Sequence, residues 1–213
     1  MPMTFSAKGG GEDFKRVPAG THLAVCNLVA DVGVQPGSGM YPDPKHQIYI
    51  RWEIPGERTE YEKDGKKMEG PMTIGRFYTA SMGTKANLRK DLESWRNKAF
   101  TDEEAEAFDV GSILGKACLL NVVNSEKGEK TYANVKGVSG LIKGMEAPKA
   151  ENPLLLYAPD HKQTYDALPK WLRDKIDGQL DAAPAPTASR EAIEDAMAQE
   201  ASGRDDFEDS IPF

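Results

Sequence analysis

Aromatic and cationic side chains recur at short spacing in three separate segments of the chain. Single-stranded nucleic acid is bound by aromatic rings that stack on the bases and by cations that contact the phosphates, and arginine can do both. Tyrosine and arginine are also common on exposed strand faces, where aromatic pairs stabilise a sheet, so each residue alone has a structural interpretation. Together they predict a surface that binds single-stranded DNA, formed by Tyr49, Arg51, Arg76, Tyr78, Tyr132 and Lys136.

The sequence offers no comparable grouping for catalysis. It has no glycine-rich phosphate loop of the Walker type, no carboxylate pair that stands out from the surface acids, and no legible cluster of serine, cysteine and histidine. The three histidines are scattered rather than set at metal-ligand spacing. A catalytic site assembled from distant residues would not be visible in such patterns. We therefore predict a protein that is not an enzyme, with no catalytic residue, metal or cofactor.

Charge is distributed unevenly along the chain. The formal net charge is −7, but residues 190–213 alone contain eight acids and only two arginines, which is a charge of −6. The first 189 residues carry 25 basic and 26 acidic side chains and are close to neutral. A basic surface on the body of the protein would therefore be hidden in the total. Cys26 and Cys118 lie among apolar neighbours, which is typical of buried free thiols in a reducing compartment.

The first pair of candidate residues lies on a predicted strand with two distinct faces. Residues 46–54 alternate strictly, so that one face is apolar and indicates a core. The other face carries Tyr49 and Arg51, and we expect it to be free for binding. Pro55-Gly56 is expected to end this strand, and the charged segment 57–70 to form a loop.

The other predicted strands are interrupted by one helical block. Residues 84–108 show apolar residues at helical spacing, and Thr101 with Glu104 has the arrangement of a capping box. A short amphipathic helix is expected at 168–176. The period-2 pattern and the density of β-branched residues predict the remaining strands at 21–34, 71–81, 116–125 and 130–142.

This order of elements predicts a mainly β fold, a five-stranded OB-fold barrel with a helical insertion between strands 3 and 4. A β-sandwich fragment would contain similar strands, but the single helical block at this point favours the barrel. The exposed strand face and loops of an OB-fold bind oligonucleotides or oligosaccharides. We expect a flexible arm at 1–16, this domain with its helical flank at 17–180, and a disordered linker and acidic tail at 181–213.

The acidic tail has the composition of a protein-binding segment. Its acids surround Phe207 and precede Ile211-Pro212-Phe213. A basic surface on another protein can capture such a segment, with Phe213 in an apolar pocket and its α-carboxylate against a cation. The same negative segment can also compete weakly for the DNA surface of the chain. The expected partner-binding residues are Asp205, Asp206, Glu208, Asp209, Ile211, Pro212 and Phe213.

Two resemblances extend these expectations. The segment DDFEDSIPF resembles the C-terminal tip of bacterial single-stranded DNA-binding proteins, which docks replication and repair proteins, and the partner-binding residues match it position by position. The body is similar to phage-encoded OB-fold single-stranded DNA-binding proteins, on the segments ANLRKDLESWRNKAFTDEEAEAFDVGSILGKACLLNV and KTYANVKGVSGL. The resemblance implies a sequence-independent protein that coats single strands in phage DNA replication, recombination or repair.

Several alternatives stay open from the sequence. A recombination mediator or strand-annealing protein would use the same surface, and an interaction adaptor would keep the tail without binding DNA. The chain has no apolar run that could span a membrane and no visible signal peptide, which predicts a location in the cytoplasm, that of the host cell if the protein is phage-encoded. An OB-fold can act alone or as a homo-oligomer, and the sequence does not decide between these states.

Overall fold

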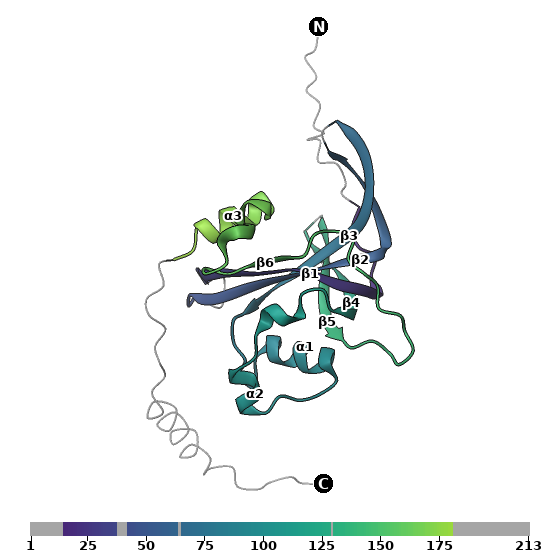
Figure 1. Cartoon of the computed structure of the whole chain (residues 1–213). Helices are drawn as coiled ribbons and strands as arrows, with labels where there is room; N and C mark the ends of the chain where they lie inside the picture. The colour runs from purple at the N-terminus through teal and green to yellow at the C-terminus, as the bar shows by residue number, and fades with distance from the viewer. Residues whose placement is uncertain (1–14, 38–41, 64, 129, 181–213) are drawn as a thin grey trace, which may run out of the picture. The chain divides into compact units, whose positions relative to one another are not determined.

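The protein is mainly β, as the sequence predicts (Figure 1). The computed structural model describes residues 15–37, 42–63, 65–128 and 130–180. The strands are β1 Gly20–Gln35, β2 Lys45–Lys63, β3 Lys66–Thr79, β4 Ala117–Lys127, β5 Lys130–Ser139 and β6 Leu155–Tyr157. The helices are α1 Asn87–Arg96, α2 Asp102–Glu106 and α3 Lys170–Asp177, with short 3-10 helices η1 Val110–Ile113 and η2 Lys162–Ala167.

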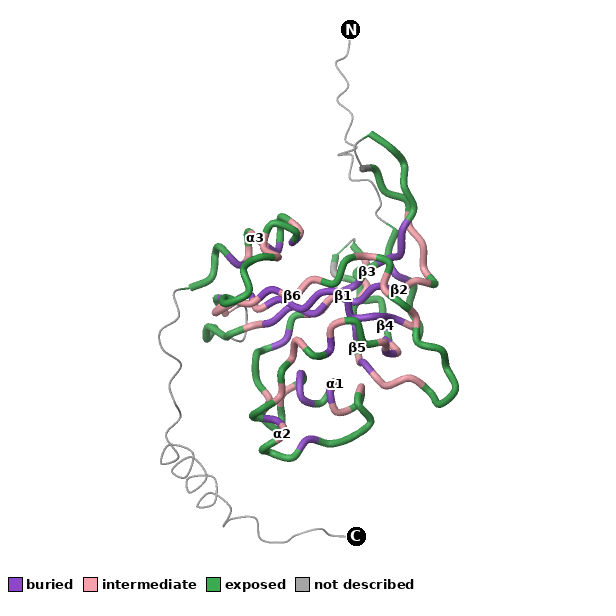
Figure 2. The backbone as a smooth tube through the Cα atoms, viewed as in Figure 1, coloured by how far each residue is buried: buried purple, intermediate pink, exposed green. Residues whose placement is uncertain are grey.

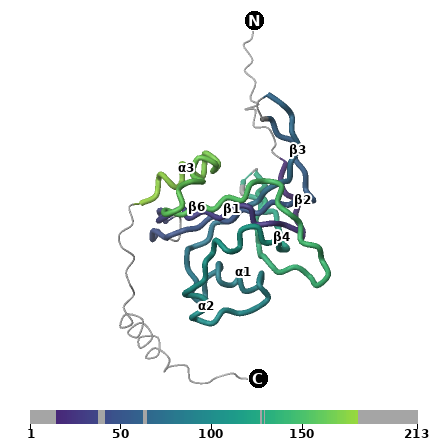
Figure 3. Tube along the Cα trace, in the orientation of Figure 1, coloured from purple at the N-terminus to yellow at the C-terminus, as the bar shows by residue number. Residues whose placement is uncertain are grey.

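The strands form one curled sheet in the order β3-β2-β1-β4-β5, and all neighbours in this order are antiparallel. Strand β1 pairs with β4 along residues 20–25, and β6 pairs with β1 in parallel along residues 28–30 (Figure 3). Strands β3 and β5 approach each other, with Cα atoms within 8 Å. The strand pairs found in the described part of the chain include no ladder between these two edges.

The main core lies on the side of the sheet that faces α1 (Figure 2). The apolar face predicted for residues 46–54 is confirmed, because Ile48, Ile50, Trp52 and Ile54 are all buried there. Helix α1 covers this core with Leu88 and Leu92. We call this side of the sheet the inner face, and the opposite side the outer face.

A second, smaller core lies on the outer face, under α3. Leu172 and Ile176 of α3 pack with Leu28 and Val32 of β1. A register shift after Cys26 inserts one residue into β1, so residues that follow it exchange faces. The even-numbered residues Ala24 and Cys26 before the shift belong to the inner core, and the even-numbered residues Leu28, Ala30 and Val32 after it belong to the outer core. The predicted amphipathic helix at 168–176 is confirmed, and it covers part of the face that we expected to be free.

The expected end of the second strand at Pro55-Gly56 is wrong. Strand β2 continues to Lys63, and residues 58–63 pair with residues 66–71 to form an arm that extends beyond the rest of the sheet (Figure 1). The ladder skips from Ile54 to Arg58, so Pro55 lies at a bulge where its missing N–H removes no ladder hydrogen bond. Proline therefore did not break the strand, and the segment 57–70 is not an open loop.

The helical block between β3 and β4 is divided into α1, α2 and η1. Its predicted capping box is confirmed. The Glu104 backbone N–H donates to Thr101 Oγ1 at 3.1 Å, and the Thr101 N–H donates to Glu104 Oε2 at 3.4 Å. The three residues of β6 were not predicted, because so short a segment shows no period.

Candidate functional site

Three aromatic rings contact one another on the outer face, and we call them the aromatic platform: Tyr49 of β2, Phe77 of β3 and Trp171 of α3. The Tyr49 ring centroid lies 4.8 Å from that of Phe77 and 5.1 Å from that of Trp171. Tyr49 is 7% exposed, whereas Phe77 is 38% and Trp171 is 49% exposed. Two rings are therefore available to a ligand, and the buried ring supports them.

The local sequence explains how the platform is built. Tyr49 and Phe77 are direct partners in the β2–β3 ladder, so their side chains share a face. A Cβ atom at Gly75 would lie 2.0 Å from Tyr49 Oη, so the absence of a side chain at Gly75 gives the tyrosine ring its space. Burial raises the pKa of Tyr49, which stays a neutral phenol at physiological pH.

Two cations accompany the platform. Lys175 lies one helical turn after Trp171, and its Nζ is 5.1 Å from the Phe77 ring centroid. Arg51 follows Tyr49 on the same face of β2, and its Nε donates to Asn27 Oδ1 at 3.1 Å. Burial lowers the pKa of Arg51 from its usual high value, but a guanidinium remains charged at neutral pH. Lys175 is thus in direct contact with an aromatic ring of the platform.

Glu53 follows Arg51 on the outer face of β2, and it marks one end of the exposed surface because it is covered by another segment. Glu53 is fully buried, and its carboxylate accepts from the backbone N–H of Glu151 at 2.6 Å and of Asn152 at 2.9 Å. It also accepts from Asn152 Nδ2 at 2.7 Å. The expectation that this whole face is free is therefore corrected, because the segment before β6 and helix α3 cover much of it. The exposed part lies toward Phe77.

The structure places the predicted residues Arg76 and Tyr78 on the inner face. The ladder pairs Tyr78 with Ile48, and the tyrosine ring is only 4% exposed. Arg76 Nη1 and Tyr78 Oη each donate to Asp91 Oδ2 at 2.8 Å, and the Arg76 guanidinium lies 4.8 Å from the Tyr78 ring centroid. The exposure of Tyr78 was predicted incorrectly, because alternation within a strand does not reveal which face the neighbouring strand and α1 will cover. Arg76 is partly covered, with 26% of its side chain exposed beside Asp91.

The predicted residues Tyr132 and Lys136 are exposed on β5, and the Tyr132 ring is 47% exposed. Asn134 lies between them, and its Nδ2 donates to Ser125 Oγ on β4 at 2.8 Å. Val135, which alternates with them, is buried in the inner core. Tyr132 therefore lies on the outer face with Tyr49 and Arg51, whereas Lys136 is exposed at a bulge where β5 has one residue more than β4.

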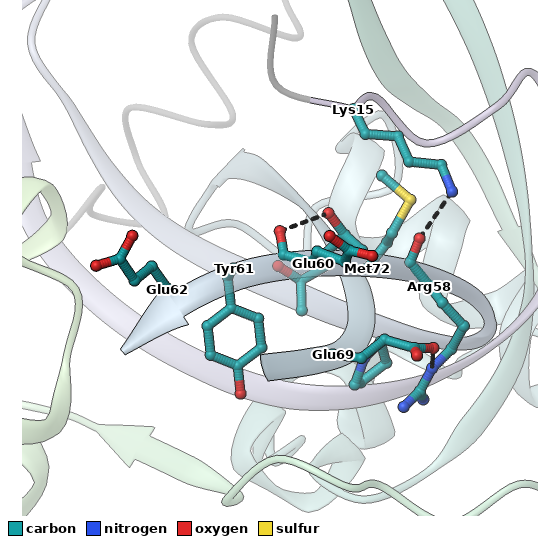
Figure 4. A pocket seen from close by; sticks show the side chains of 10 residues that line it. Lys15, Arg58, Glu60, Tyr61, Glu62, Glu69 and Met72 are labelled. Carbon is teal, nitrogen blue, oxygen red and sulfur yellow. Dashed lines mark hydrogen bonds and ion pairs between the residues drawn. The ribbon is translucent and has the colours of Figure 1, made fainter. Parts of the chain in front are cut away.

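The arm forms a separate open groove of about 1140 Å³ (Figure 4). Lys15 Nζ donates to the backbone carbonyl of Arg58 at 2.8 Å, and Arg58 pairs with Glu69 at 3.1 Å. Glu60 and Glu62 also line this groove. Three carboxylates against two cations would repel phosphate, so the arm is a poorer candidate for nucleic-acid binding than the platform.

Sequence analysis did not identify Phe77, Trp171 or Lys175 as site residues. Phe77 alternates with Arg76 and Tyr78, and Trp171 lies in the amphipathic helix expected at 168–176, for which the sequence indicates no binding role. One signal was available in the sequence. Phe77 and Ile74 point to opposite faces of β3, so Phe77 would be expected on the exposed face once Ile74 is known to lie on the inner face. The predicted partner-binding residues at 205–213 lie outside the described part of the chain.

No match is found for this chain among protein-family models, curated proteins or solved structures. Within the described ranges, no group of three or more histidine, cysteine, aspartate or glutamate residues is placed to hold a metal ion. In the same part of the chain, no helix combines the length and apolar character needed to cross a membrane. The candidate site therefore rests on its own geometry.

Proposed function

We propose that this chain binds single-stranded DNA without sequence preference, through the aromatic platform and its two cations. The observation that carries the proposal is the contact of two half-exposed rings, Phe77 and Trp171, with Lys175 Nζ lying over the Phe77 ring at 5.1 Å from its centroid. Base stacking on aromatic rings is independent of sequence, because every base has a π-face. The bases of a duplex are stacked on each other and cannot use these rings.

The arrangement of strands supports the same function. The order β3-β2-β1-β4-β5, with helices between β3 and β4, is that of an OB-fold barrel opened between its third and fifth strands. OB-folds bind oligonucleotides on the face of strands 2 and 3, which is where Tyr49 and Phe77 lie. We therefore propose an OB-fold assignment together with the binding function.

In the proposed complex the residues have separate roles. Phe77 and Trp171 stack on bases, while Lys175 and Arg51 contact the phosphates between them. Tyr132 and Lys136 offer a third ring and a third cation on β5. A DNA single strand that contacts both places would be covered by the protein without recognition of its base sequence. This fits a protective role in DNA replication, recombination or repair.

Fluorescence anisotropy with a labelled oligo-dT of about 30 nucleotides tests the proposal. Phe77→Ala and Trp171→Ala are each expected to weaken binding by about 5- to 150-fold, the effect of losing roughly 1–3 kcal/mol of base stacking. Trp171→Phe should retain most of the affinity, because it keeps a ring.

Tyr61→Ala is the matched control, since Tyr61 is an equally exposed ring on the arm, 45% exposed, and should bind oligo-dT like the wild type. A duplex of equal length should bind much more weakly than the single strand. Equal affinities of Phe77→Ala, Trp171→Ala and Tyr61→Ala would contradict the assignment of the platform.

A further inference from the structure

Asn27 is the residue that the register shift adds to β1. Cys26 pairs with Trp52, and Leu28 pairs with Arg51, on the neighbouring strand. Asn27 therefore has no partner of its own on β2, and its side chain is fully buried. Bulges of this kind redirect a side chain and are frequent beside functional sites. Here the bulge brings a buried amide into contact with Arg51, one of the two cations that accompany the aromatic platform.

The contact fixes the Arg51 side chain at one nitrogen. Arg51 Nε donates to Asn27 Oδ1 at 3.1 Å. Because a guanidinium is planar, a hydrogen bond at Nε also restricts the directions of Nη1 and Nη2. Within the described ranges, neither of these two nitrogens has a hydrogen-bond or ion-pair partner. They are also not among the buried side-chain atoms that lack a partner, so they remain in contact with solvent.

Glu53 is the acid that acts on Arg51 from the same face of β2. Its carboxylate already accepts hydrogen bonds from the backbone N–H groups of Glu151 and Asn152 and from Asn152 Nδ2. No ion pair joins Glu53 to Arg51 in the part of the chain that the structure describes. The donors on Nη1 and Nη2 are therefore available to an anion from outside the chain.

The amide of Asn27 is only half satisfied. Its Nδ2 is buried and has no hydrogen-bond partner among the described residues. A buried amide donor without an acceptor is destabilising, and an apolar side chain of the same shape would avoid this penalty. An unsatisfied buried group calls for an explanation other than packing, and the hydrogen bond to Arg51 offers one.

We propose that Asn27 is a positioning residue for DNA binding, which holds the Arg51 guanidinium so that Nη1 and Nη2 bind two oxygens of one backbone phosphate. This inference rests on the proposed function. Arginine–phosphate contacts with two parallel hydrogen bonds are strong and depend on orientation. Arg51 follows Tyr49 on the same face of β2, so the phosphate would lie beside a base stacked on the aromatic platform.

Asn27→Leu tests this role, because leucine has nearly the shape of asparagine and no hydrogen-bonding group in its side chain. Oligo-dT affinity, measured by fluorescence anisotropy, is expected to fall about 3- to 10-fold, the effect of losing one ordinary hydrogen bond. The slope of log affinity against log salt should become shallower by about 0.7, because one phosphate contact is lost. The urea midpoint should stay the same or rise, since the unpaired Nδ2 is removed.

A double-mutant cycle separates positioning from a general structural effect. Arg51→Ala alone should weaken oligo-dT binding about tenfold, and Asn27→Leu should add nothing to it, because its effect acts through Arg51. Arg51→Lys, which leaves the buried Asn27 in place, should also lose several-fold in affinity, since lysine has no planar fork of N–H donors. Asn124→Leu is the matched control, because it makes the same substitution at an exposed position on β4 and should bind oligo-dT like the wild type.

Three results would overturn the proposal: wild-type affinity in Asn27→Leu, the same loss from Asn27→Leu with and without Arg51→Ala, or wild-type affinity in Arg51→Lys. A loss of affinity that comes with a lower urea midpoint and an unchanged salt slope would also overturn it, because it would show a purely structural role. If oligo-dT binding depends on Phe77 but not on Asn27, this inference fails and the proposed function stands. Absence of binding by the wild type contradicts the proposed function itself, and this inference fails with it.

Discussion

Asp91 shows why two of the predicted DNA-binding residues belong to the inner face of the sheet. Its carboxylate accepts from both Arg76 and Tyr78, and burial raises the pKa of Asp91. The cluster is internally satisfied, with the positive charge of Arg76 opposite the negative charge of Asp91. It joins β3 to α1, so we interpret it as a structural contact.

Substitution of Tyr78 separates the structural role from a DNA-binding role. Tyr78→Phe is expected to lower the free energy of unfolding by about 1–2 kcal/mol, because Asp91 loses a hydrogen-bond donor. Its affinity for oligo-dT should stay within twofold of the wild type. Urea unfolding and anisotropy measure the two effects. The control Tyr132→Phe, at an exposed ring, should not change stability, and a large loss of DNA affinity in Tyr78→Phe would place its ring in the site after all.

Buried ionisable groups predict a loss of stability in alkali. Burial raises the pKa of Cys26 to about 12 and also raises the pKa of Cys118, Tyr49 and Tyr78. A group whose pKa is higher in the folded state keeps its proton longer than in the unfolded chain. Its stabilisation is complete below the unfolded pKa, about 9 for a thiol, and is lost as the pH rises toward the folded value.

We therefore expect the urea midpoint to fall progressively when the pH is raised from 8 to 11. Thiol titration should show little reaction of Cys26 and Cys118 in the folded protein at pH 8 and full reaction in urea, since the thiolate is the reactive form. Rapid labelling without urea, or a midpoint that rises with pH, would contradict the burial of these groups.

Strand β3 and helix α3 together orient the platform. The position of Trp171 depends on α3 packing against β1 through Leu172, and the position of Tyr49 depends on the space above Gly75. A change that moves Tyr49 should therefore also disturb Trp171, since the two rings are in edge contact.

Gly75→Ala tests this dependence. The new methyl group would overlap Tyr49 Oη, so we expect a shift in tryptophan fluorescence and a loss of oligo-dT affinity of about fivefold or more, together with roughly 1–3 kcal/mol of destabilisation from overpacking. Gly137→Ala is the matched control in β5, because a Cβ there meets no atom within 4 Å. Identical DNA binding by Gly75→Ala and Gly137→Ala would show that the platform does not depend on Tyr49.

The charge of the whole molecule limits how strongly binding can depend on salt. The first 189 residues are nearly neutral, and the proposed site offers only Arg51, Lys175 and Lys136 to phosphates. For single strands each phosphate contact contributes about −0.7 to the slope of log affinity against log salt, so three contacts predict a slope of about −2. Base stacking, which is insensitive to salt, should supply the rest of the affinity.

Anisotropy titrations between 50 and 200 mM salt measure this slope. Lys175→Ala should make it shallower by about 0.7, whereas Lys66→Ala on the arm should leave it unchanged. A slope near −5 would indicate a much larger basic surface than the platform provides.

Local pattern in the sequence determined much of the architecture. Strict alternation identified the buried face of β2, the capping box identified α2, and helical spacing identified α1 and α3, because each signal depends on residues that are close in sequence. Alternation did not show that β2 continues past Pro55, since a bulge that excludes proline from the ladder is created by the partner strand.

Only the tertiary structure decided which residues share a face. Pairing of Tyr49 with Phe77, rather than with Tyr78, placed Arg76 and Tyr78 on the inner face. The approach of α3 then brought Trp171 and Lys175 to rings more than 90 positions earlier in the chain. Register between strands and docking of a distant helix are non-local contacts, and a single strand's periodicity contains no information about either.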